Sequence, residues 1–284
     1  MTNRTVVLLF LASTFGAQPL YSAQTTTEKP ASQMDNAQAV RASVIAIVTR
    51  IQRADYEGDR PALEKLFQDL APFTGNHDLA SRVRYWRGFA KWRRAINGFN
   101  ETVDPKVQED DLNAARGEFD QASALDPTFM DGKIGSASCF GILIGLHLKE
   151  PDRVHELAVQ GRALIKDVQA AQPDNPRLAF VYGPNVWYAP PERGGGQDKA
   201  IEIYQKGLDA ARKQKPPADP LEPSWGEPEL LMNLAWSNLN RTAPDLKVAQ
   251  QDAEAALKIV PYWHYVRDIL LPQISAAEAK AAAH

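Results

Sequence analysis

The sequence predicts an all-α protein, an α-solenoid built from antiparallel helix pairs. Apolar residues recur at helical spacing nearly everywhere after Met34, and no convincing run of alternating β-branched residues occurs. Polar or proline-containing breaks separate the helical segments, and helices joined by short connections lie antiparallel. The 284 residues suit one large or two ordinary domains, but a solenoid escapes that limit because each repeat packs only on its neighbours.

Residues 1–23 have the pattern of a secretory signal peptide. Arg4 gives a positive start, residues 5–15 are almost wholly apolar, and small residues follow as far as Ala23. The apolar run is shorter than the roughly 20 residues that span a bilayer. We therefore predict cleavage after Ala23, with Ala17 as a second candidate and an uncleaved anchor as the alternative. Cleavage would make the mature protein periplasmic or secreted.

The mature chain divides into a lead-in, one repeat domain and a tail. Residues 24–34 are polar and rich in threonine, which predicts a flexible lead-in. The helical repeat domain is expected over residues 35–275. Residues 276–284 are rich in alanine and are expected to fray.

Each expected helix follows from an apolar stripe that ends at a break. The first helix carries Val40, Val44 and Ile47 on one face and ends near Gly58. The second has Pro61 in its first turn, a favoured place for proline. In chain order the expected helices cover residues 35–56, 61–70, 79–96, 109–125, 131–148, 153–171, 176–186, 198–213, 228–239, 246–259 and 262–274.

The second helix of successive pairs repeats one spacing of small, large and proline residues. The small residues let two helices approach, the larger one fills the space between them, and the proline ends the helix. The complete sets are Ala115, Phe119, Ala122, Pro127; Gly161, Ile165, Val168, Pro173; and Ala249, Ala253, Ala256, Pro261. The helix over 198–213 begins the same spacing, with its proline displaced to Pro216.

These residues resemble the second helix of the tetratricopeptide repeat, in its exported bacterial form. The first helices match less closely, although Gly88, Ala137, Gly183 and Ala235 place a small residue at one common position. The resemblance covers residues 82–261 and implies a right-handed superhelix whose concave groove is lined by the first helix of each pair. The second-helix prolines lie further apart than the family's period of about 34 residues, a length that also fits HEAT-type pairs.

The resemblance implies a groove lined by aromatic and arginine side chains. Exposed aromatics beside arginines suit the recognition of peptides or carboxylates. The alternative is that the aromatics are core residues and the arginines a solvated face. The candidate groove residues are Arg82, Tyr85, Phe89, Trp92, Arg93, Phe180, Trp187, Tyr188 and Trp236.

The loop over residues 187–196 is a second candidate site. Gly194, Gly195 and Gly196 precede a helix and could present backbone N–H groups to an anion, with help from Arg193 and Lys199. The spacing of a Walker loop is missing. The alternative is a long turn between helices, in which the glycines supply unusual backbone angles.

Several function classes lack the residues they need. The formal net charge is −3 and the charges are interspersed, so no basic stripe for nucleic acid is present, and no later apolar run reaches membrane-spanning length. The histidines lack the close helical spacing of a zinc site, so we expect no metal and no cofactor. Cys139, the only cysteine, lies in an apolar helical run and is expected to be buried and inert. No nucleophile elbow or carboxylate pair predicts catalytic residues.

The sequence therefore predicts an exported, non-catalytic protein that binds a protein or peptide partner in its concave groove, in a scaffold or assembly role. It is expected to be a monomer or a weak homo-oligomer. The alternative is a periplasmic ligand-binding component of a transport system that uses the loop over 187–196. A more remote alternative is an enzyme with an unrecognised site.

Overall fold

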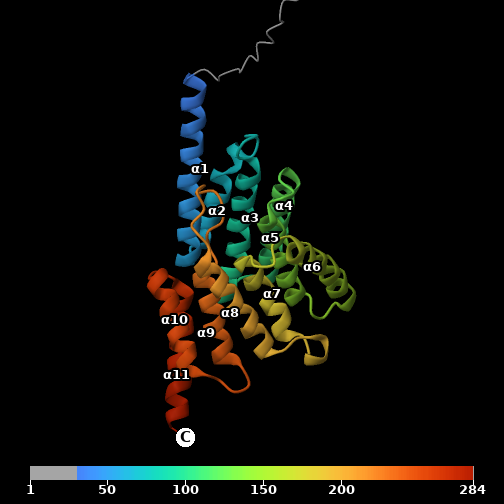
Figure 1. Ribbon diagram of the computed structural model, residues 1–284, viewed down its shortest axis with the longest axis vertical. Helices are drawn as coiled ribbons and strands as arrows, with labels where there is room; N and C mark the ends of the chain where they lie inside the picture. Colours follow the sequence, from blue (N-terminus) through green and yellow to red (C-terminus); the bar gives the residue numbers. More distant parts are fainter. Residues whose placement is uncertain (1–30, 284) are drawn as a thin grey trace, which may run out of the picture. The chain divides into compact units, whose positions relative to one another are not determined.

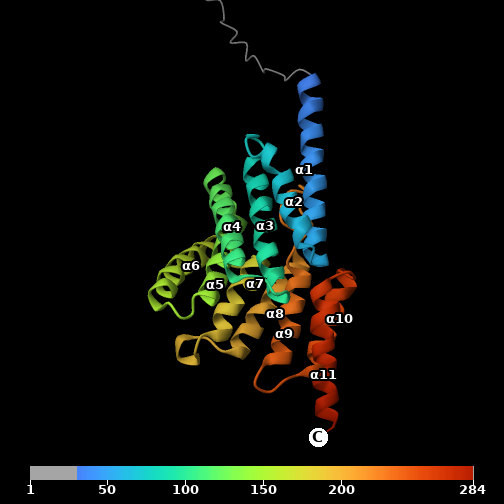
Figure 2. The same cartoon turned by 180° about the vertical axis from the view of Figure 1, so that it is seen from behind.

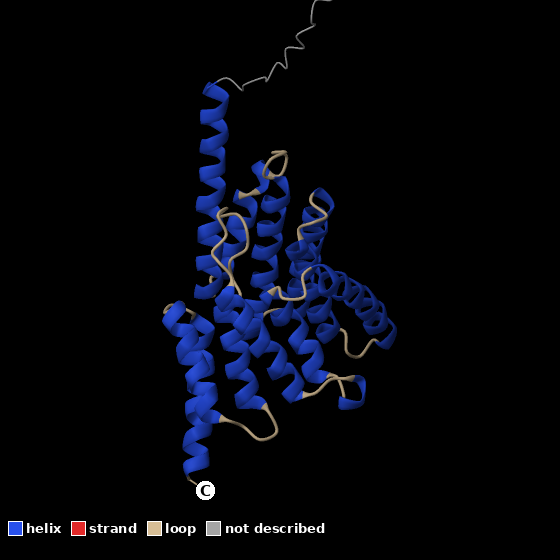
Figure 3. Ribbon diagram, viewed as in Figure 1, coloured by secondary structure: helices blue, strands red, loops and turns tan. Residues whose placement is uncertain are grey.

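The computed structural model describes residues 31–283, and side chains from residue 35. The predicted signal segment lies outside the described residues, as does most of the predicted lead-in. The chain divides into a unit over residues 1–38 and a second over residues 39–284, and the site lies entirely in the second. No strand occurs within residues 31–283, so the prediction of an all-α protein is confirmed (Figure 3).

The helices follow one another closely along the chain (Figure 1). In chain order they are α1 (Ala31–Glu57), α2 (Arg60–Asp69), α3 (Ala80–Asn97), α4 (Pro105–Leu125), α5 (Met130–Leu146), α6 (Pro151–Ala171), α7 (Pro176–Tyr188), α8 (Gln197–Lys213), α9 (Glu227–Asn240), α10 (Leu246–Ile259) and α11 (Leu271–Ala282). Short 3-10 turns cover Ala71–Phe73, Gly98–Asn100 and Pro191–Arg193, and a π-helical turn covers Tyr265–Leu270.

Helices that adjoin in sequence pack as antiparallel pairs in the second unit. The most extensive contacts are α3 with α4, α5 with α6, α7 with α8, and α9 with α10, and both views show these hairpins side by side (Figures 1 and 2). Less extensive contacts, such as those of α4 with α5 and of α8 with α9, join one helix pair to the next. This is the predicted solenoid of helix pairs.

The small and large residues of the repeat spacing meet as the sequence predicts. Ala115, Phe119 and Ala122 of α4 are fully buried. A Cβ atom at Gly88 of α3 would lie 2.8 Å from Cδ1 of Phe119, so only glycine lets the two helices approach this closely. Gly183 of α7 faces the ring of Tyr204 of α8 in the same way.

Two helices, α1 and α4, begin earlier in the sequence than expected. α1 begins at Ala31, inside the predicted lead-in, and α4 begins at Pro105 instead of residue 109. The Asp104 side chain accepts a hydrogen bond from the Lys106 N–H, and Pro105 needs no such acceptor. This capped start adds a turn that the apolar stripe alone does not indicate.

The carboxyl-terminal end is helical where fraying was expected. α11 continues to Ala282 because alanine has the highest intrinsic helix propensity and Ile274 is fully buried. Pro272 lies in its first turn and cannot donate a backbone hydrogen bond to the preceding turn. The π-helical turn at Tyr265–Leu270 directly precedes α11 and accommodates the backbone hydrogen bond that Pro272 cannot donate.

Replacing Gly183 with alanine should lower the free energy of unfolding by about 1–3 kcal/mol, because the added methyl group would overlap the buried ring of Tyr204. Chemical denaturation measures this change. The matched control is Gly117→Ala in α4, where a Cβ meets nothing within 4 Å, and a small gain in stability is expected. Equal effects of the two substitutions would contradict the close approach of α7 and α8.

Asp252 of α10 should make stability depend on pH. Burial raises the pKa of Asp252 to about 6, whereas an unfolded aspartate has a pKa of about 3.9. Between these values the folded chain holds a proton that the unfolded chain has lost, so stability from this group falls as the pH rises from about 4 to about 6.

Asp252→Asn should therefore raise the melting temperature near neutral pH and change little at about pH 4. Thermal melts over this range check the expectation, with Glu254→Gln, an exposed position on the same helix, as the control. A gain of the same size at both pH values would show that the effect does not come from the Asp252 proton.

Candidate functional site

A non-helical segment between α8 and α9 lies against α1, α3 and α7. We call residues 214–226 the strap. In Figure 1 the strap is the orange loop that runs alongside α1 and α2 before it returns to α9. Its only internal backbone hydrogen bond is a turn from the Glu222 N–H to the Asp219 carbonyl, 3.0 Å. The strap therefore keeps its position through contacts with the helices.

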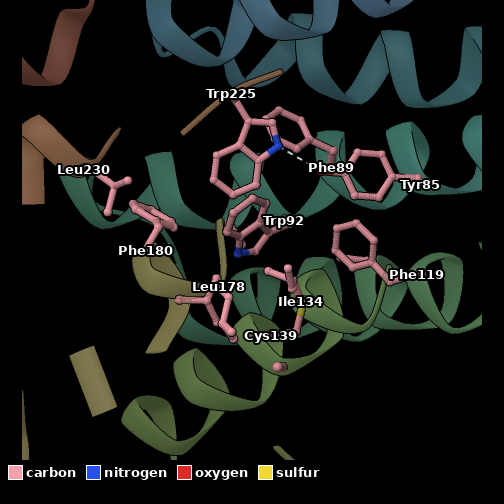
Figure 4. Packing of buried hydrophobic residues seen from close by; sticks show 14 of the residues in the cluster. Tyr85, Phe89, Trp92, Phe119, Ile134, Cys139, Leu178, Phe180, Trp225 and Leu230 are labelled. Carbon is pink, nitrogen blue, oxygen red and sulfur yellow. Dashed lines mark hydrogen bonds between the residues drawn. The ribbon is translucent and has the colours of Figure 1, made fainter. Parts of the chain in front are cut away.

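The strap inserts one aromatic side chain into an aromatic cluster. The ring of Trp225 lies 5.9 Å from Phe89, 5.6 Å from Trp92 and 5.6 Å from Phe180, centroid to centroid (Figure 4). Its indole N–H donates to the Tyr85 hydroxyl oxygen at 2.8 Å. Such ring contacts are tilted or edge-on, the arrangement that aromatic pairs favour. We call Tyr85, Phe89, Trp92 and Phe180 the groove cluster.

Side-chain donors of α3 and α7 hold the backbone of the strap. The indole N–H of Trp86 donates to the Leu221 carbonyl at 2.8 Å. A guanidinium N–H of Arg177 donates to the Trp225 carbonyl at 3.3 Å, and the same group pairs with the buried carboxylate of Asp131. The recognition of main-chain carbonyls does not depend on which side chains the held segment carries.

Arginines hold the acidic side chains of the strap. Arg82 of α3 donates to Glu222 at 2.7 Å and to Asp126 at 2.8 Å, and its guanidinium stacks on the ring of Phe129. Arg41 of α1 pairs with Asp219 at 2.5 Å. These ion pairs are partly exposed, so they orient the segment more than they stabilise it.

A buried carboxylate fixes the point where the strap enters α9. Glu229 accepts the Gly226 N–H at 2.8 Å and the Tyr56 hydroxyl at 2.5 Å. Gly226 has φ +140°, a conformation that side-chain-bearing residues rarely adopt. Burial raises the pKa of Glu229, and the Tyr56 hydrogen bond and the nearby Arg93 oppose that rise.

Arg93 lies behind the groove cluster, in a second buried set of charges. Its Nε donates to Asp55 at 2.7 Å, and the Asn97 amide donates to the same carboxylate at 3.1 Å. Burial raises the pKa of Asp55 and the Arg93 charge lowers it. The charges of Arg93 and Asp55 are thus matched by each other, as buried charges require.

The predicted groove residues separate into two groups. Tyr85, Phe89, Trp92 and Phe180 are brought together and buried under the chain's own strap, with Arg82 half-buried beside them and Arg93 buried behind them. The other residues lie at the far end of α7 and on α9. There Trp187 and Trp236 pack ring to ring at 5.3 Å, and Tyr188 is 76% exposed.

Sequence reasoning missed the strap and its anchors. The residues not predicted are Trp86, Leu221, Glu222 and Trp225. One signal was present, because Leu221 and Trp225 are apolar residues in an otherwise polar, proline-rich break. Loops on the surface seldom carry two such residues unless the residues are buried.

The glycine-rich loop adopts the long turn that was the alternative to an anion site. The N–H groups of Gly194, Gly195 and Gly196 donate to the carbonyls of Pro191, Pro190 and Val186 at 2.9, 3.2 and 2.9 Å. These donors are therefore used within the loop. Lys199 pairs with Glu202 at 2.8 Å, and Arg193 is exposed.

A hollow of about 690 Å³ lies beside this loop. Trp187, Pro191 and Gly196 line it, together with the charged residues Asp198, Lys199 and Glu202. Asp198 in the first turn of α8 would oppose an anionic ligand, and Lys199 is already paired with Glu202. Within the described residues no group of three or more possible ligands could hold a metal ion.

Cys139 is fully buried, as expected, and burial raises the pKa of its thiol. A raised pKa keeps the group protonated, and the thiolate is the nucleophilic form.

No helix among the described residues has both the length and the hydropathy to cross a membrane.

No protein-family model matches the chain, and no curated protein matches it significantly. Among solved structures, the HusA haemophore from Porphyromonas gingivalis is 17% identical, with a TM-score of 0.54 over 68% of this chain and 90% of that chain. A thermophilic TPR protein from Thermus thermophilus is also 17% identical, with a TM-score of 0.44 over 78% of this chain and 99% of that chain. At this identity the likeness to the haemophore shows a shared helical fold.

Glu229 should contribute to stability mainly as a hydrogen-bond acceptor. Glu229→Ala leaves the Gly226 N–H and the Tyr56 hydroxyl without an acceptor, at a cost of about 1–3 kcal/mol for each buried group. Glu229→Gln keeps an acceptor oxygen and should cost clearly less. Chemical denaturation of both variants measures the difference, and equal losses would show that the charge matters and not the acceptor.

Proposed function

We propose that the protein is a non-catalytic binding protein whose concave face takes a segment of a protein or peptide partner. One observation carries this proposal: α3 and α7 hold the strap as a binding groove holds a peptide. An aromatic anchor enters a buried cluster, main-chain carbonyls accept hydrogen bonds from fixed donors, and arginines pair with acidic side chains. Binding hot spots in protein interfaces combine the same features.

The groove has the residues for this recognition on rigid elements. The groove cluster and Trp86 come from α3 and α7, which pack on neighbouring helices, so these side chains would keep their positions if the strap left them. A preformed groove lowers the ordering cost of binding. The described fold supports a scaffold for protein contacts in this general sense.

The charged groups of the groove support binding and not catalysis. Asp55 and Asp131 are buried and each is paired with an arginine, while Glu229 accepts from a tyrosine and a backbone N–H. A general acid or base needs to reach its substrate. These carboxylates are instead engaged by the chain itself.

Export belongs to the same proposal. The signal segment predicted over residues 1–23 would deliver the helical domain to the periplasm or the medium, where the partner would be another exported chain. The ordered domain would then be the repeat region expected over residues 35–275.

A second candidate function is the binding of a small ligand beside α7 and α8, in a transport system. The hollow next to Trp187 and the exposed ring of Tyr188 favour it. The haemophore that shares the fold is by its name a carrier of haem. A planar apolar ligand would suit the hollow better than an anion, because Trp187 lines it together with Asp198 and Glu202.

Site-specific photo-crosslinking distinguishes the two functions. A photoreactive amino acid at Thr128, which is exposed and bonded to the Asp126 that pairs with Arg82, should give adducts with other polypeptides in the cell envelope. The same group at Lys166, exposed on α6, is the matched control and should give none. No polypeptide adducts at Thr128, together with a rise in melting temperature on adding a small ligand, would reject the peptide role in favour of the second candidate.

A further inference from the structure

We propose that the strap is a built-in competitor for the groove, and that the partner presents a non-helical segment with an acidic residue three positions before an aromatic one. This inference rests on the proposed function, and it names the class of partner and the way its access is controlled. In the strap, Glu222 and Trp225 have this spacing, and each contacts a different part of the groove.

The topology does not require the strap to enter the groove. α8 and α9 pack directly on each other, as α4 and α5 do. The link from α4 to α5 needs only residues 126–129, whereas the link from α8 to α9 takes residues 214–226. The additional length of the second link is the part that reaches α1, α3 and α7. It acts as a ligand tethered to the fold, and the connection itself could be much shorter.

The strap is held at one end only. Residues 214–216 are exposed and form no hydrogen bond with α1, α3 or α7, since the Gln214 N–H donates only to the last turn of α8, and Pro216 and Pro217 lack backbone N–H donors. The anchored part begins with Asp219 and ends with Gly226. A segment with a free arm and a glycine at its fixed end can leave the groove while α8 and α9 stay in place.

The contacts of the strap define what a partner must supply. The groove cluster takes one aromatic ring, the Tyr85 hydroxyl accepts one N–H, and Arg82 takes a carboxylate. The donors of Trp86 and Arg177 take carbonyls of any sequence. The specificity of the groove therefore comes from the acidic residue, the indole and the distance between them.

A tethered competitor lowers the apparent affinity of every ligand of the same site by the same factor. The apparent affinity of a partner falls by the fraction of molecules whose groove is open, and a short tether holds the strap at a high effective concentration. Loosening the strap should therefore strengthen the binding of a peptide that carries the same anchors, without any new contact.

The test uses a fluorescently labelled peptide with the sequence of residues 218–226 and the full-length chain. Anisotropy titrations compare the native protein with the double variant Glu222→Ala, Trp225→Ala. We expect the double variant to bind the peptide at least about tenfold more tightly than the native chain. A peptide with alanine in place of its tryptophan should lose this binding. Phe99→Ala, which removes an exposed aromatic ring away from the strap and the groove cluster, is the control and should bind as the native chain does.

A second variant guards against loss of folding when Trp225 is removed. Glu222→Arg breaks the ion pair with Arg82 at a half-buried position and leaves the aromatic cluster filled. It should increase peptide binding by a smaller factor, and thermal melts confirm that it remains folded. Equal affinity for the native chain and for both variants would overturn the competitor role of the strap.

Selection from a random peptide library on the folded variants separates this inference from the proposed function. Enrichment of peptides with an acidic residue three positions before an aromatic supports both. Enrichment of peptides without that spacing leaves the groove as a binding site and overturns the partner class. If neither the strap peptide nor any library peptide binds, the proposed function fails together with the inference.

Discussion

A buried arginine that requires an opposite charge joins helices of the second unit that are far apart in sequence. Arg93 of α3 lies in the interior, where an unpaired charge is very costly, so Asp55 of α1 has to reach it. Tyr56, the next residue, bonds to Glu229 of α9, 173 positions away. Local helix pairing alone would stack each hairpin on its neighbour. These charge contacts additionally join α1 to α9 and so define the interior that the strap enters.

The same charges position the groove. Glu229 accepts the Gly226 N–H, and Arg177 links Asp131 to the Trp225 carbonyl, so both polar groups of the Trp225–Gly226 peptide bond are tied to buried carboxylates. Burial raises the pKa of Glu229 because a charge here lacks water. A site built in this way tolerates little variation in its charged residues, whereas its partly exposed ion pairs, such as Arg82 with Glu222, can change without loss of the fold.

The helices were predictable because their signals are local. Apolar spacing and prolines predicted the breaks between helices to within a few residues from α1 to α10, but α11 begins at Leu271 and not at residue 262. The Gly88 and Phe119 contact follows from a repeat visible in the sequence. The start of α4 was missed because the cap at Asp104 precedes the apolar stripe. The site could be predicted only in part. The resemblance placed Tyr85, Phe89, Trp92 and Phe180 on one face, but nothing near Trp225 in sequence indicates that it completes their cluster, since that contact joins α3, α7 and a loop without periodicity.

The placement of Trp225 beside Trp92 also gives the protein an internal optical reporter. Their ring centroids are 5.6 Å apart, close enough for the two indoles to couple electronically, and both are shielded from water. An indole that enters water emits at longer wavelength and no longer couples to its neighbour. The near-ultraviolet circular dichroism and the emission colour of the unlabelled chain thus record whether the loop before α9 is seated. The chain has six tryptophans, and Trp187 and Trp236 pack on each other without contacting the strap, so their signals provide a reference.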